Sequence, residues 1–331
     1  MTIAASSPLA EATIHVGLTK CASTTLQDIA HRAPGIDLIG YQPLDPLRLA
    51  AMQSALQPQT PAPRFQLKLP APALAPGANP LLSDERLVDW RTQQNHPVNG
   101  TQLAAYQRHC AQSLKQLCPR GKVLLITRRP DRWIQSRYRQ DTLLFNPLPL
   151  LRYARRQSGY LRQAYGLDFL YDLYADLFGA ERVCVLPMEL LQHDPAEFYD
   201  SLQAFTGLSF RAPDTAATHQ NRGLSDAVIE QIRRFHATVD AMSRRGGGQP
   251  QQHWTVKRSM FGLITQTLLD QPRLQDQAQR LMPDFTAPRP PADLIASLRQ
   301  ASARVVQMPA FDRFRDQYLP QPEEAEPAAA A

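Results

Sequence analysis

The stretch TIHVGLTKCASTTLQDI, residues 13–29, decides the fold of this chain of 331 residues. A short β-branched run leads directly into a tight turn at residues 17–20, and a group of hydroxyl residues then opens an amphipathic helix. A strand that feeds a helix in this way points several free backbone N–H groups and the positive end of the helix dipole at one place. The stretch therefore predicts a cradle for an anion such as phosphate.

The side chains of this loop support the same interpretation. Lys20 adds a positive charge, and the hydroxyls after it are further hydrogen-bond donors. The residues that we predict to line the cradle are Gly17, Lys20, Cys21, Ala22, Ser23, Thr24 and Thr25. Because Cys21 lies near a helix N-terminus, we expect a lowered pKa for its thiol and easy alkylation. The alternative is an ordinary strand, turn and helix with a solvated lysine.

The order of residues in the loop is not that of a Walker A motif. G-x-x-x-x-G-K-[ST] needs a second glycine and a lysine directly before the hydroxyl, whereas Lys20 lies well before Ser23. The hydroxyl that usually binds magnesium is therefore not placed, which counts against a hydrolase of ATP or GTP.

A second stretch, KVLLITRRPDRWIQSRY at residues 122–138, repeats the pattern of an apolar strand followed by a helix. Pro130 suits the first turn of that helix. Arg128 lies at the carboxyl end of the expected strand, where open α/β sheets bind ligands, and Ser136 lies two turns into the helix. An arginine fork and a hydroxyl so placed can bind a second phosphate. The alternative is a solvated basic helix start.

Together the two stretches resemble the sulfotransferase superfamily that uses 3′-phosphoadenosine 5′-phosphosulfate (PAPS), in particular bacterial members similar to carbohydrate sulfotransferases. In that family G-x-x-K-[ST]-G-[ST]-[ST]-x-L holds the 5′-phosphosulfate and R-x-P-x-x-x-x-x-S holds the 3′-phosphate. The matching residues here are Gly17, Lys20, Ser23, Thr24 and Leu26 for the first motif, and Arg128, Pro130 and Ser136 for the second. Weaker similarity at residues 81–87, 182–209 and 221–236 extends the resemblance over roughly residues 13–240.

The resemblance implies a fold, a reaction and a co-substrate. The fold is α/β, a P-loop-containing nucleotide-binding fold with a central, mostly parallel sheet flanked by helices, and the alternation of strand and helix patterns independently predicts a parallel sheet. The reaction is transfer of the sulfuryl group from PAPS to a hydroxyl or amine, with a sugar of a polysaccharide or glycolipid as the expected acceptor. Arg222, in a segment similar to N-R-x-L-S, is a further candidate for nucleotide binding, with a structural salt bridge as the alternative.

Two departures from the family pattern bear on activity. Ala22 stands where the family usually has glycine, which matters if the position needs a positive φ. Gln42 stands where carbohydrate sulfotransferases can carry a carboxylate, and an amide is no proton acceptor at neutral pH. We therefore assign Lys20, Glu85 and Asp84 as the catalytic candidates, with one of the two carboxylates as the base; Asp45 and His96 follow. The alternative role for Glu85 is interaction with a helix dipole.

Composition narrows the remaining classes. The four cysteines and the His, Asp and Glu residues show no metal-ligand spacing, so we expect no metal. The net charge of +6 comes from arginines scattered beside acidic residues, which indicates a nucleotide and not a nucleic acid as partner. No leader and no run of twenty apolar residues is evident, so we expect a cytoplasmic protein without stable membrane insertion.

For the domain organisation we expect a flexible N-terminus at residues 1–12, one sulfotransferase-like domain at 13–318, and a disordered tail at 319–331. Residues 56–80, rich in proline and alanine, are expected to form an irregular insertion. Two other functions stay open: a kinase of a small molecule of the P-loop type, and a nucleotide-binding protein that has lost catalysis, as Ala22 and Gln42 would suggest.

Overall fold

The computed structural model describes residues 9–59, 67, 79–90, 98–144, 146–210, 224–245, 276–277, 280–282, 285–286 and 288–319. Contacts divide the chain into two compact units. The first comprises Met1–Pro130, Ser158–Thr218 and Ala292–Ala331, and the second comprises Asp131–Gln157 and His219–Pro291. The first unit contains all the strands described below.

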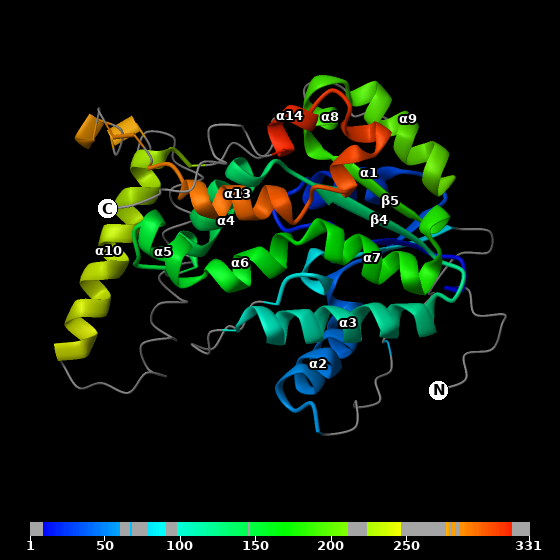
Figure 1. Cartoon of the computed structure of the whole chain (residues 1–331), viewed down its shortest axis with the longest axis horizontal. Coiled ribbons are helices and arrows are strands. Elements are labelled where there is room, and N and C mark those ends of the chain that lie inside the picture. Colours follow the sequence, from blue (N-terminus) through cyan, green and yellow to red (C-terminus); the bar gives the residue numbers. More distant parts are fainter. Residues whose placement is uncertain are drawn as a thin grey trace. The chain divides into compact units, whose positions relative to one another are not determined.

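A parallel sheet forms the centre of the first unit (Figure 1). Its strands are β1 (Thr13–His15), β2 (Ile36–Ile39), β3 (Asn79–Ser83), β4 (Lys122–Thr127) and β5 (Val183–Pro187). They lie in the order β2-β3-β1-β4-β5, and every neighbouring pair is parallel. The α/β fold with a parallel central sheet flanked by helices, predicted from the sequence, is thereby confirmed.

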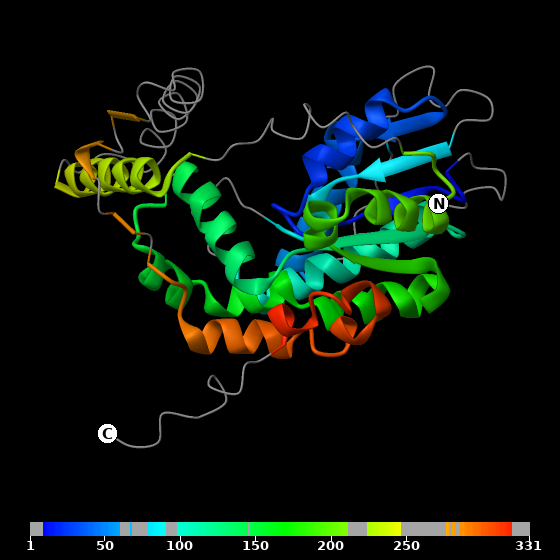
Figure 2. The same cartoon turned by 90° about the horizontal axis from the view of Figure 1, so that it is seen from above.

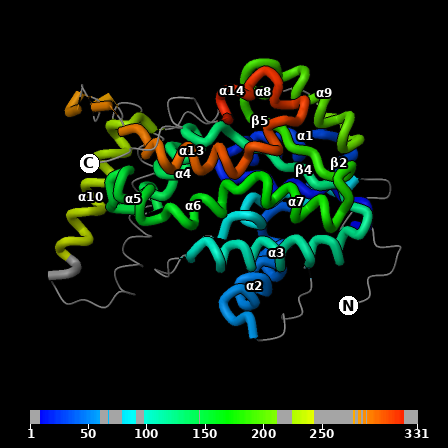
Figure 3. Tube along the Cα trace, in the orientation of Figure 1, coloured from blue at the N-terminus to red at the C-terminus, as the bar shows by residue number. Residues whose placement is uncertain are grey.

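Helices cover both faces of this sheet. The first unit contains α1 (Ser23–Arg32), α2 (Tyr41–Leu56), η1 (Glu85–Leu87), α3 (Gly100–Leu117), α6 (Ser158–Tyr165), α7 (Leu167–Phe178), η2 (Ala180–Arg182), α8 (Met188–His193), α9 (Pro195–Thr206), α13 (Ala292–Gln300), η4 (Val305–Gln307), η5 (Pro309–Phe311) and α14 (Arg315–Tyr318). Helices α1, α8 and α9 lie on one side of the strands and α3 and α7 on the other, as the tube in Figure 3 also shows.

Burial explains why the strands are so apolar. In β4 the four residues Val123–Ile126 are each no more than 1% exposed, as expected for a parallel strand with helices over both faces. On α1 the stripe of Leu26, Ile29 and Ala30 is buried, which is the face that its 3.6-residue period predicts. Apolar burial on both faces thus fixes the sheet beneath the loop that follows β1.

The strand order places a switch point between β1 and β4. The chain leaves β1 through α1 towards β2, whereas it leaves β4 for β5 on the opposite side of the sheet. In open α/β sheets ligands bind outside the carboxyl ends of the strands at such a point. The two candidate phosphate-binding stretches follow these two strands (Figure 2).

The second unit contains α4 (Pro130–Leu143, whose first residue still belongs to the first unit), α5 (Leu150–Arg156) and α10 (Asp226–Arg245). Helix α4 begins at Pro130, as predicted. Asp141 ties α4 to α5, since its carboxylate accepts hydrogen bonds from Arg137 (3.2 Å) and from the Tyr153 hydroxyl (2.6 Å).

At the amino-terminal end, Leu9–Ala12 runs beside the start of β4. The N–H of Lys122 donates to the carbonyl of Ala12 (3.1 Å), and Leu9, Ala10 and Ala12 are buried. Residues 1–8, most of 60–78 and the tail 320–331 lie outside the described residues. Within the described part of the chain, no helix is long and apolar enough to span a membrane.

Candidate anion site at the switch point of the sheet

The loop after β1 continues along β4 before it turns. The N–H of Val16 donates to the carbonyl of Leu124 (3.0 Å), and the N–H of Leu18 donates to the carbonyl of Ile126 (3.1 Å). This pairing carries the loop to the carboxyl end of β4, where Arg128 follows. The first and second candidate stretches therefore meet at one edge of the sheet.

The turn itself contains two left-handed residues that are not glycine. Lys20 has φ 69° and Ala22 has φ 62°. For residues with a Cβ this conformation costs roughly 1–2 kcal/mol. Turns of this kind form backbone concavities that bind anions, and strain of this size is typical of functional loops. A glycine at position 22 would adopt this positive φ without strain.

We expect Ala22→Gly to raise the free energy of unfolding by about 1 kcal/mol, because glycine removes the left-handed strain and adds only part of that amount in unfolded-state entropy. The check is denaturant unfolding. Ala33, with φ −81° after the last turn of the same helix, is the matched control. Ala33→Gly should lower stability by about 0.5–1 kcal/mol. If Ala22→Gly also lowered the stability, the left-handed backbone of Ala22 would not be strained.

The first turn of α1 presents backbone N–H groups that the helix itself leaves without acceptors. The cap residue Ala22 has a methyl side chain that cannot accept a hydrogen bond, and its carbonyl accepts one from the N–H of Leu26 (2.9 Å). The N–H groups of Ser23, Thr24 and Thr25 therefore have no acceptor within the helix. No acidic residue lies in this turn, so no carboxylate of α1 itself offsets the positive end of the dipole. The Ser23 hydroxyl is buried and has no hydrogen-bond partner among the described residues.

Four charged side chains act on the loop at Cys21. Its thiol feels the positive charges of Arg128 and Lys20 and the negative charges of Glu189 and Glu85. Burial dominates, however, and raises the pKa of the Cys21 thiol well above its ordinary value. The expectation of a lowered pKa and easy alkylation was therefore wrong, because Cys21 is fully buried and not at the surface of the cradle.

The turn that carries Arg128 is held from three directions. The carbonyl of Arg128 accepts a hydrogen bond from the Tyr165 hydroxyl at the end of α6 (2.9 Å). The backbone N–H of Arg129 donates to one carboxylate oxygen of Glu189, near the start of α8 (3.1 Å). The Tyr318 hydroxyl of α14 donates to the other oxygen of this carboxylate (2.5 Å). Glu189 is 5% exposed. These contacts fix the backbone from which Arg128 extends.

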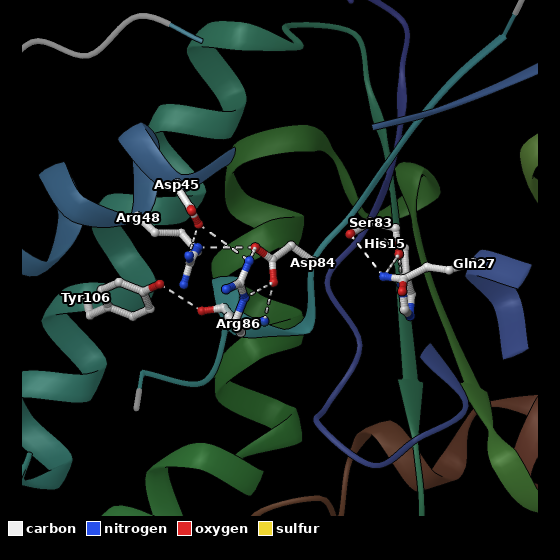
Figure 4. Close-up of polar contacts among 8 residues, drawn as sticks. All are labelled: His15, Gln27, Asp45, Arg48, Ser83, Asp84, Arg86 and Tyr106. Atoms are coloured by element: carbon white, nitrogen blue, oxygen red, sulfur yellow. Dashed lines mark hydrogen bonds and ion pairs between the residues drawn. The ribbon is translucent and has the colours of Figure 1, made fainter. Parts of the chain in front are cut away.

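The two candidate carboxylates after β3 have different surroundings, and Figure 4 shows those of Asp84. Asp84 is fully buried and accepts hydrogen bonds from the backbone and side chain of Arg86, at 2.9 Å each for N and Nε, and its other oxygen lies 3.2 Å from Arg48 Nε. Burial nevertheless raises the pKa of Asp84, although both arginines favour the ionised form. Asp45, a lower-ranked candidate for the base, pairs with the same two arginines and is half-exposed.

Glu85, the residue after Asp84, is half-buried. Its charge raises the pKa of Cys21 and also that of the Tyr41 hydroxyl, where burial is the larger cause. The guanidinium of Arg86 lies over the Tyr41 ring, 4.3 Å from its centroid. Of the two candidate carboxylates after β3, Glu85 is the one whose charge acts on Cys21 in the loop. The carboxylate of Asp84 is bound by Arg86 and Arg48.

His15, the last residue of β1, lies beneath the loop. Its Nδ1 is 2.8 Å from the Ser83 hydroxyl, and the Gln27 amide of α1 donates to both Oγ and the carbonyl of Ser83 (Figure 4). A Cβ on Gly17 would lie 2.5 Å from Nε2 of this ring. Glycine is thus required at position 17 by the close approach of His15.

We expect Gly17→Ala to lower the free energy of unfolding by about 1–3 kcal/mol, because the added methyl overlaps a fully buried ring that cannot move without breaking its bond to Ser83. Thermal or urea unfolding measures the loss. Gly40→Ala is the control: no atom lies within 4 Å of a Cβ there, and a change within about 0.5 kcal/mol is expected. Equal losses of stability in Gly17→Ala and Gly40→Ala would contradict the close contact between Gly17 and the His15 ring.

The remaining predicted residues are distributed as follows. Thr24 is exposed and Thr25 half-buried on the first turn of α1, and Gln42 is exposed on the first turn of α2. Ser136 lies on α4 in the second unit. Arg222 and His96 lie outside the described residues. Over the described ranges, no three His, Cys, Asp or Glu side chains gather as a metal site.

Four residues of this region are not among those predicted from the sequence: His15, Tyr41, Glu189 and Tyr318. Glu189 follows the carboxyl end of β5, so the rule that ligands lie beyond strand ends was the available signal. Nothing local marks Tyr318, because it meets Glu189 only through the tertiary fold.

Comparison with known proteins adds little to this geometry. No protein-family model and no curated protein matches the chain. Among solved structures, the chain is similar to a sulfotransferase from Alicyclobacillus acidocaldarius, with a TM-score of 0.42 and 17% identity over 74% of this chain and 99% of that chain. A likeness with this identity and TM-score does not support a functional assignment. The function of the site is therefore inferred from the loop, Arg128 and the residues around them.

Proposed function

We propose that this chain is a sulfotransferase that moves the sulfuryl group from PAPS to a hydroxyl or amine of an acceptor. One observation carries the proposal: the loop with its unpaired helix N–H groups and the turn with Arg128 lie side by side at the switch point between β1 and β4. A ligand with two separate phosphate groups on one nucleotide suits two adjacent anion-binding elements of this kind.

The loop supplies the groups that the leaving phosphate needs. During transfer the bond between sulfur and the bridging oxygen of the 5′-phosphate breaks, and negative charge grows on that oxygen. In the proposal Lys20, the N–H groups of residues 23–25 and the Ser23 hydroxyl donate to this phosphate. Donors fixed before the reaction are commonly the largest contribution to catalysis. Gly17, Cys21 and Ala22 contribute backbone, and Thr24 and Thr25 contribute N–H groups and hydroxyls.

Arg128 is proposed to bind the 3′-phosphate. Its backbone is held by Tyr165, and its neighbour Arg129 is held by Glu189, so the guanidinium extends from a fixed turn. A planar guanidinium makes two parallel hydrogen bonds to a phosphate. Ser136 and Arg222 remain proposals from the sequence pattern for the same phosphate.

Glu85 is the base that we favour over Asp84. The base removes the proton of the acceptor hydroxyl while the acceptor oxygen attacks sulfur, so the products are the sulfated acceptor and 3′-phosphoadenosine 5′-phosphate (PAP), with the proton on the carboxylate. Asp84 already accepts hydrogen bonds from Arg86 and lies against Arg48, which leaves it little capacity for a substrate proton. Its neighbour Glu85 is half-exposed and acts on the loop.

A kinase has one observation in its favour. Asp84 follows β3, the strand next to β1, which is where an acidic residue for magnesium would suit a nucleotide on the loop. Its carboxylate, however, is paired with two guanidinium groups. A cation site beside two fixed positive charges is unfavourable, so the sulfotransferase is the better proposal. A nucleotide-binding protein without turnover is the third possibility, and it differs only in catalysis.

The finer parts of the proposal follow the sequence resemblance. We propose a sugar of a polysaccharide or glycolipid as the acceptor, PAPS as co-substrate without a metal, and action in the cytoplasm of a bacterium. The strand order and the loop support the nucleotide site and do not bear on the choice of acceptor.

Calorimetry followed by a turnover assay tests the function. PAP is titrated into the protein in EDTA, ATP is titrated with magnesium, and PAPS is then incubated with candidate glycan acceptors while PAP release is followed. The sulfotransferase predicts tight PAP binding without metal and PAP release that depends on the acceptor. Binding of ATP only with magnesium would favour the kinase, and PAP binding without release from PAPS for any acceptor would favour the inactive binder.

A further inference from the structure

His15 is a fully buried histidine with one ring nitrogen in use. Its Nδ1 lies 2.8 Å from the Ser83 hydroxyl, whereas its Nε2 is buried without a hydrogen-bond partner among the described residues. Burial lowers the pKa of His15 to about 3, so the ring is neutral at physiological pH. A neutral ring carries one proton, and its position decides what the free nitrogen can do.

The hydrogen bonds of Ser83 decide that position. The Gln27 Nε2 atom lies 3.1 Å from the carbonyl of Ser83 and 3.0 Å from its Oγ; a carbonyl only accepts, so the Gln27 atom is the donor in both. Ser83 Oγ thus already accepts a hydrogen bond. If its own hydroxyl donates to His15 Nδ1, the Oγ atom, its hydrogen and the carbonyl of Ser83 are all paired. The reverse direction would leave the buried hydroxyl hydrogen without an acceptor among the described residues.

The first arrangement is favoured because an unpaired buried polar group costs about 1–3 kcal/mol. It puts the ring proton on Nε2, the nitrogen that has no partner. The second arrangement leaves two groups unsatisfied, the Ser83 hydroxyl hydrogen and the Nε2 lone pair. The hydrogen bonds from Gln27 on α1 to Ser83 on β3, and from Ser83 to His15, therefore set the tautomer of His15.

The unpartnered nitrogen lies at the loop. Nε2 is the ring atom closest to the place where a Gly17 Cβ would stand, at the first residue of the tight turn. A second buried side-chain atom without a partner in the described part of the chain is the hydroxyl of Ser23, which opens α1 after the same loop. Ser23 is 2% exposed. Buried polar groups are normally paired, so an unpartnered Nε2 beneath the loop indicates a ligand that pairs it.

We propose that His15 is a neutral binding residue of the loop, whose Nε2–H donates to an oxygen of the bound phosphate or sulfuryl group. This inference rests on the proposed function, since it assigns a donor within the same site. Unlike Lys20, a neutral donor adds a directional hydrogen bond and no charge.

The test is nuclear magnetic resonance of the full-length protein with ¹⁵N-labelled imidazole rings. The chain has eight histidines, and the His15 signals are assigned by their loss in His15→Gln and by their shift in Ser83→Ala. The proposal predicts the Nε2–H tautomer in the free protein, and a change in the Nε2 and Nε2–H shifts on saturation with PAP. His31→Gln, an exposed residue on α1, should leave both unchanged.

Affinities supply a second readout. His15→Gln and Ser83→Ala are each expected to weaken PAP binding roughly 2–10-fold, the effect of one neutral hydrogen bond. If His15→Gln does not fold, the wild-type spectra still decide. An Nδ1–H tautomer, or an unchanged ring when calorimetry shows PAP bound, would overturn the proposal. If PAP does not bind at all, the proposed function fails instead; inorganic phosphate then serves as the probe, and the presence or absence of the same shift decides for His15.

Discussion

Lys20→Ala is expected to lower kcat for PAP release from PAPS by about 10²–10³-fold, the usual cost of losing one donor to a developing oxyanion. The alanine keeps a Cβ at a residue with φ 69°, so the backbone strain of the turn stays the same and the loop should keep its shape. The loss therefore reports the ammonium group alone. Calorimetry with PAP should show a smaller effect on the ground state, because the charge on the leaving oxygen develops only during transfer.

The matched control for this variant is Lys115→Ala. Lys115 lies on α3 and its Nζ donates to the carbonyl of Pro119 (2.7 Å), so the change removes an equal charge elsewhere in the same unit. Activity near that of wild type is expected. If Lys20→Ala turned over PAPS as fast as Lys115→Ala, the loop would not hold the leaving phosphate.

Asp84→Ala is expected to lower the free energy of unfolding by about 3–5 kcal/mol, the cost of removing one partner from a buried ion pair. Asp84 is fully buried between Arg86 and Arg48, whose side chains are 34% and 15% exposed. Without the carboxylate Arg48 would keep Asp45 as its ion-pair partner among the described residues, and η1 would lose its cap. Asp84→Asn should cost less, since an amide oxygen can still accept from the Arg86 N–H and burial already disfavours the charge, as the raised pKa of Asp84 indicates.

Two variants separate this structural role from the chemistry. Asp45→Ala removes a carboxylate of the same cluster that is 44% exposed, and it should cost within about 1 kcal/mol. Glu85→Gln keeps a side chain of the same size with an oxygen that accepts hydrogen bonds, so it should cost less stability than Asp84→Ala while it lowers kcat. A normal kcat for Glu85→Gln would remove it as the base, and an Asp84→Ala protein as stable as Asp45→Ala would contradict the buried ion pair. Urea unfolding and PAPS turnover measure the two effects.

The part of the site that the sequence predicts is marked by local sequence patterns. The strand at residues 123–127 is a continuous apolar run, and Pro130 marks the helix start because its fixed φ and missing N–H suit a first turn. The tight turn after β1 is likewise local. Helices α6 and α7 are separated at Gly166, which has φ −49° and ψ 78°.

Other features depend on tertiary structure. Helix α2 escapes prediction because Pro43 and Pro46 lie in it, although the early position of Pro43 costs no internal hydrogen bond. Strand β2, sequence IDLI, lies at the sheet edge and is mostly half-exposed, which weakens its apolar signal. The pKa of Cys21 follows from complete burial, which a position near a helix N-terminus does not reveal.

In the proposed site Arg128 binds the 3′-phosphate of a nucleotide that is held by the loop. Calorimetry with PAP and with adenosine 5′-phosphate, which lacks that phosphate, tests it in wild type, Arg128→Ala and Arg120→Ala. Arg120 is the control: it precedes the opposite end of β4 and binds Glu11 (2.8 Å).

We expect wild type and Arg120→Ala to bind PAP much more tightly than adenosine 5′-phosphate. We expect Arg128→Ala to weaken PAP binding roughly 10–150-fold and to bind adenosine 5′-phosphate about as wild type does. Equal losses for both nucleotides, or an unchanged preference for PAP in Arg128→Ala, would contradict the claim.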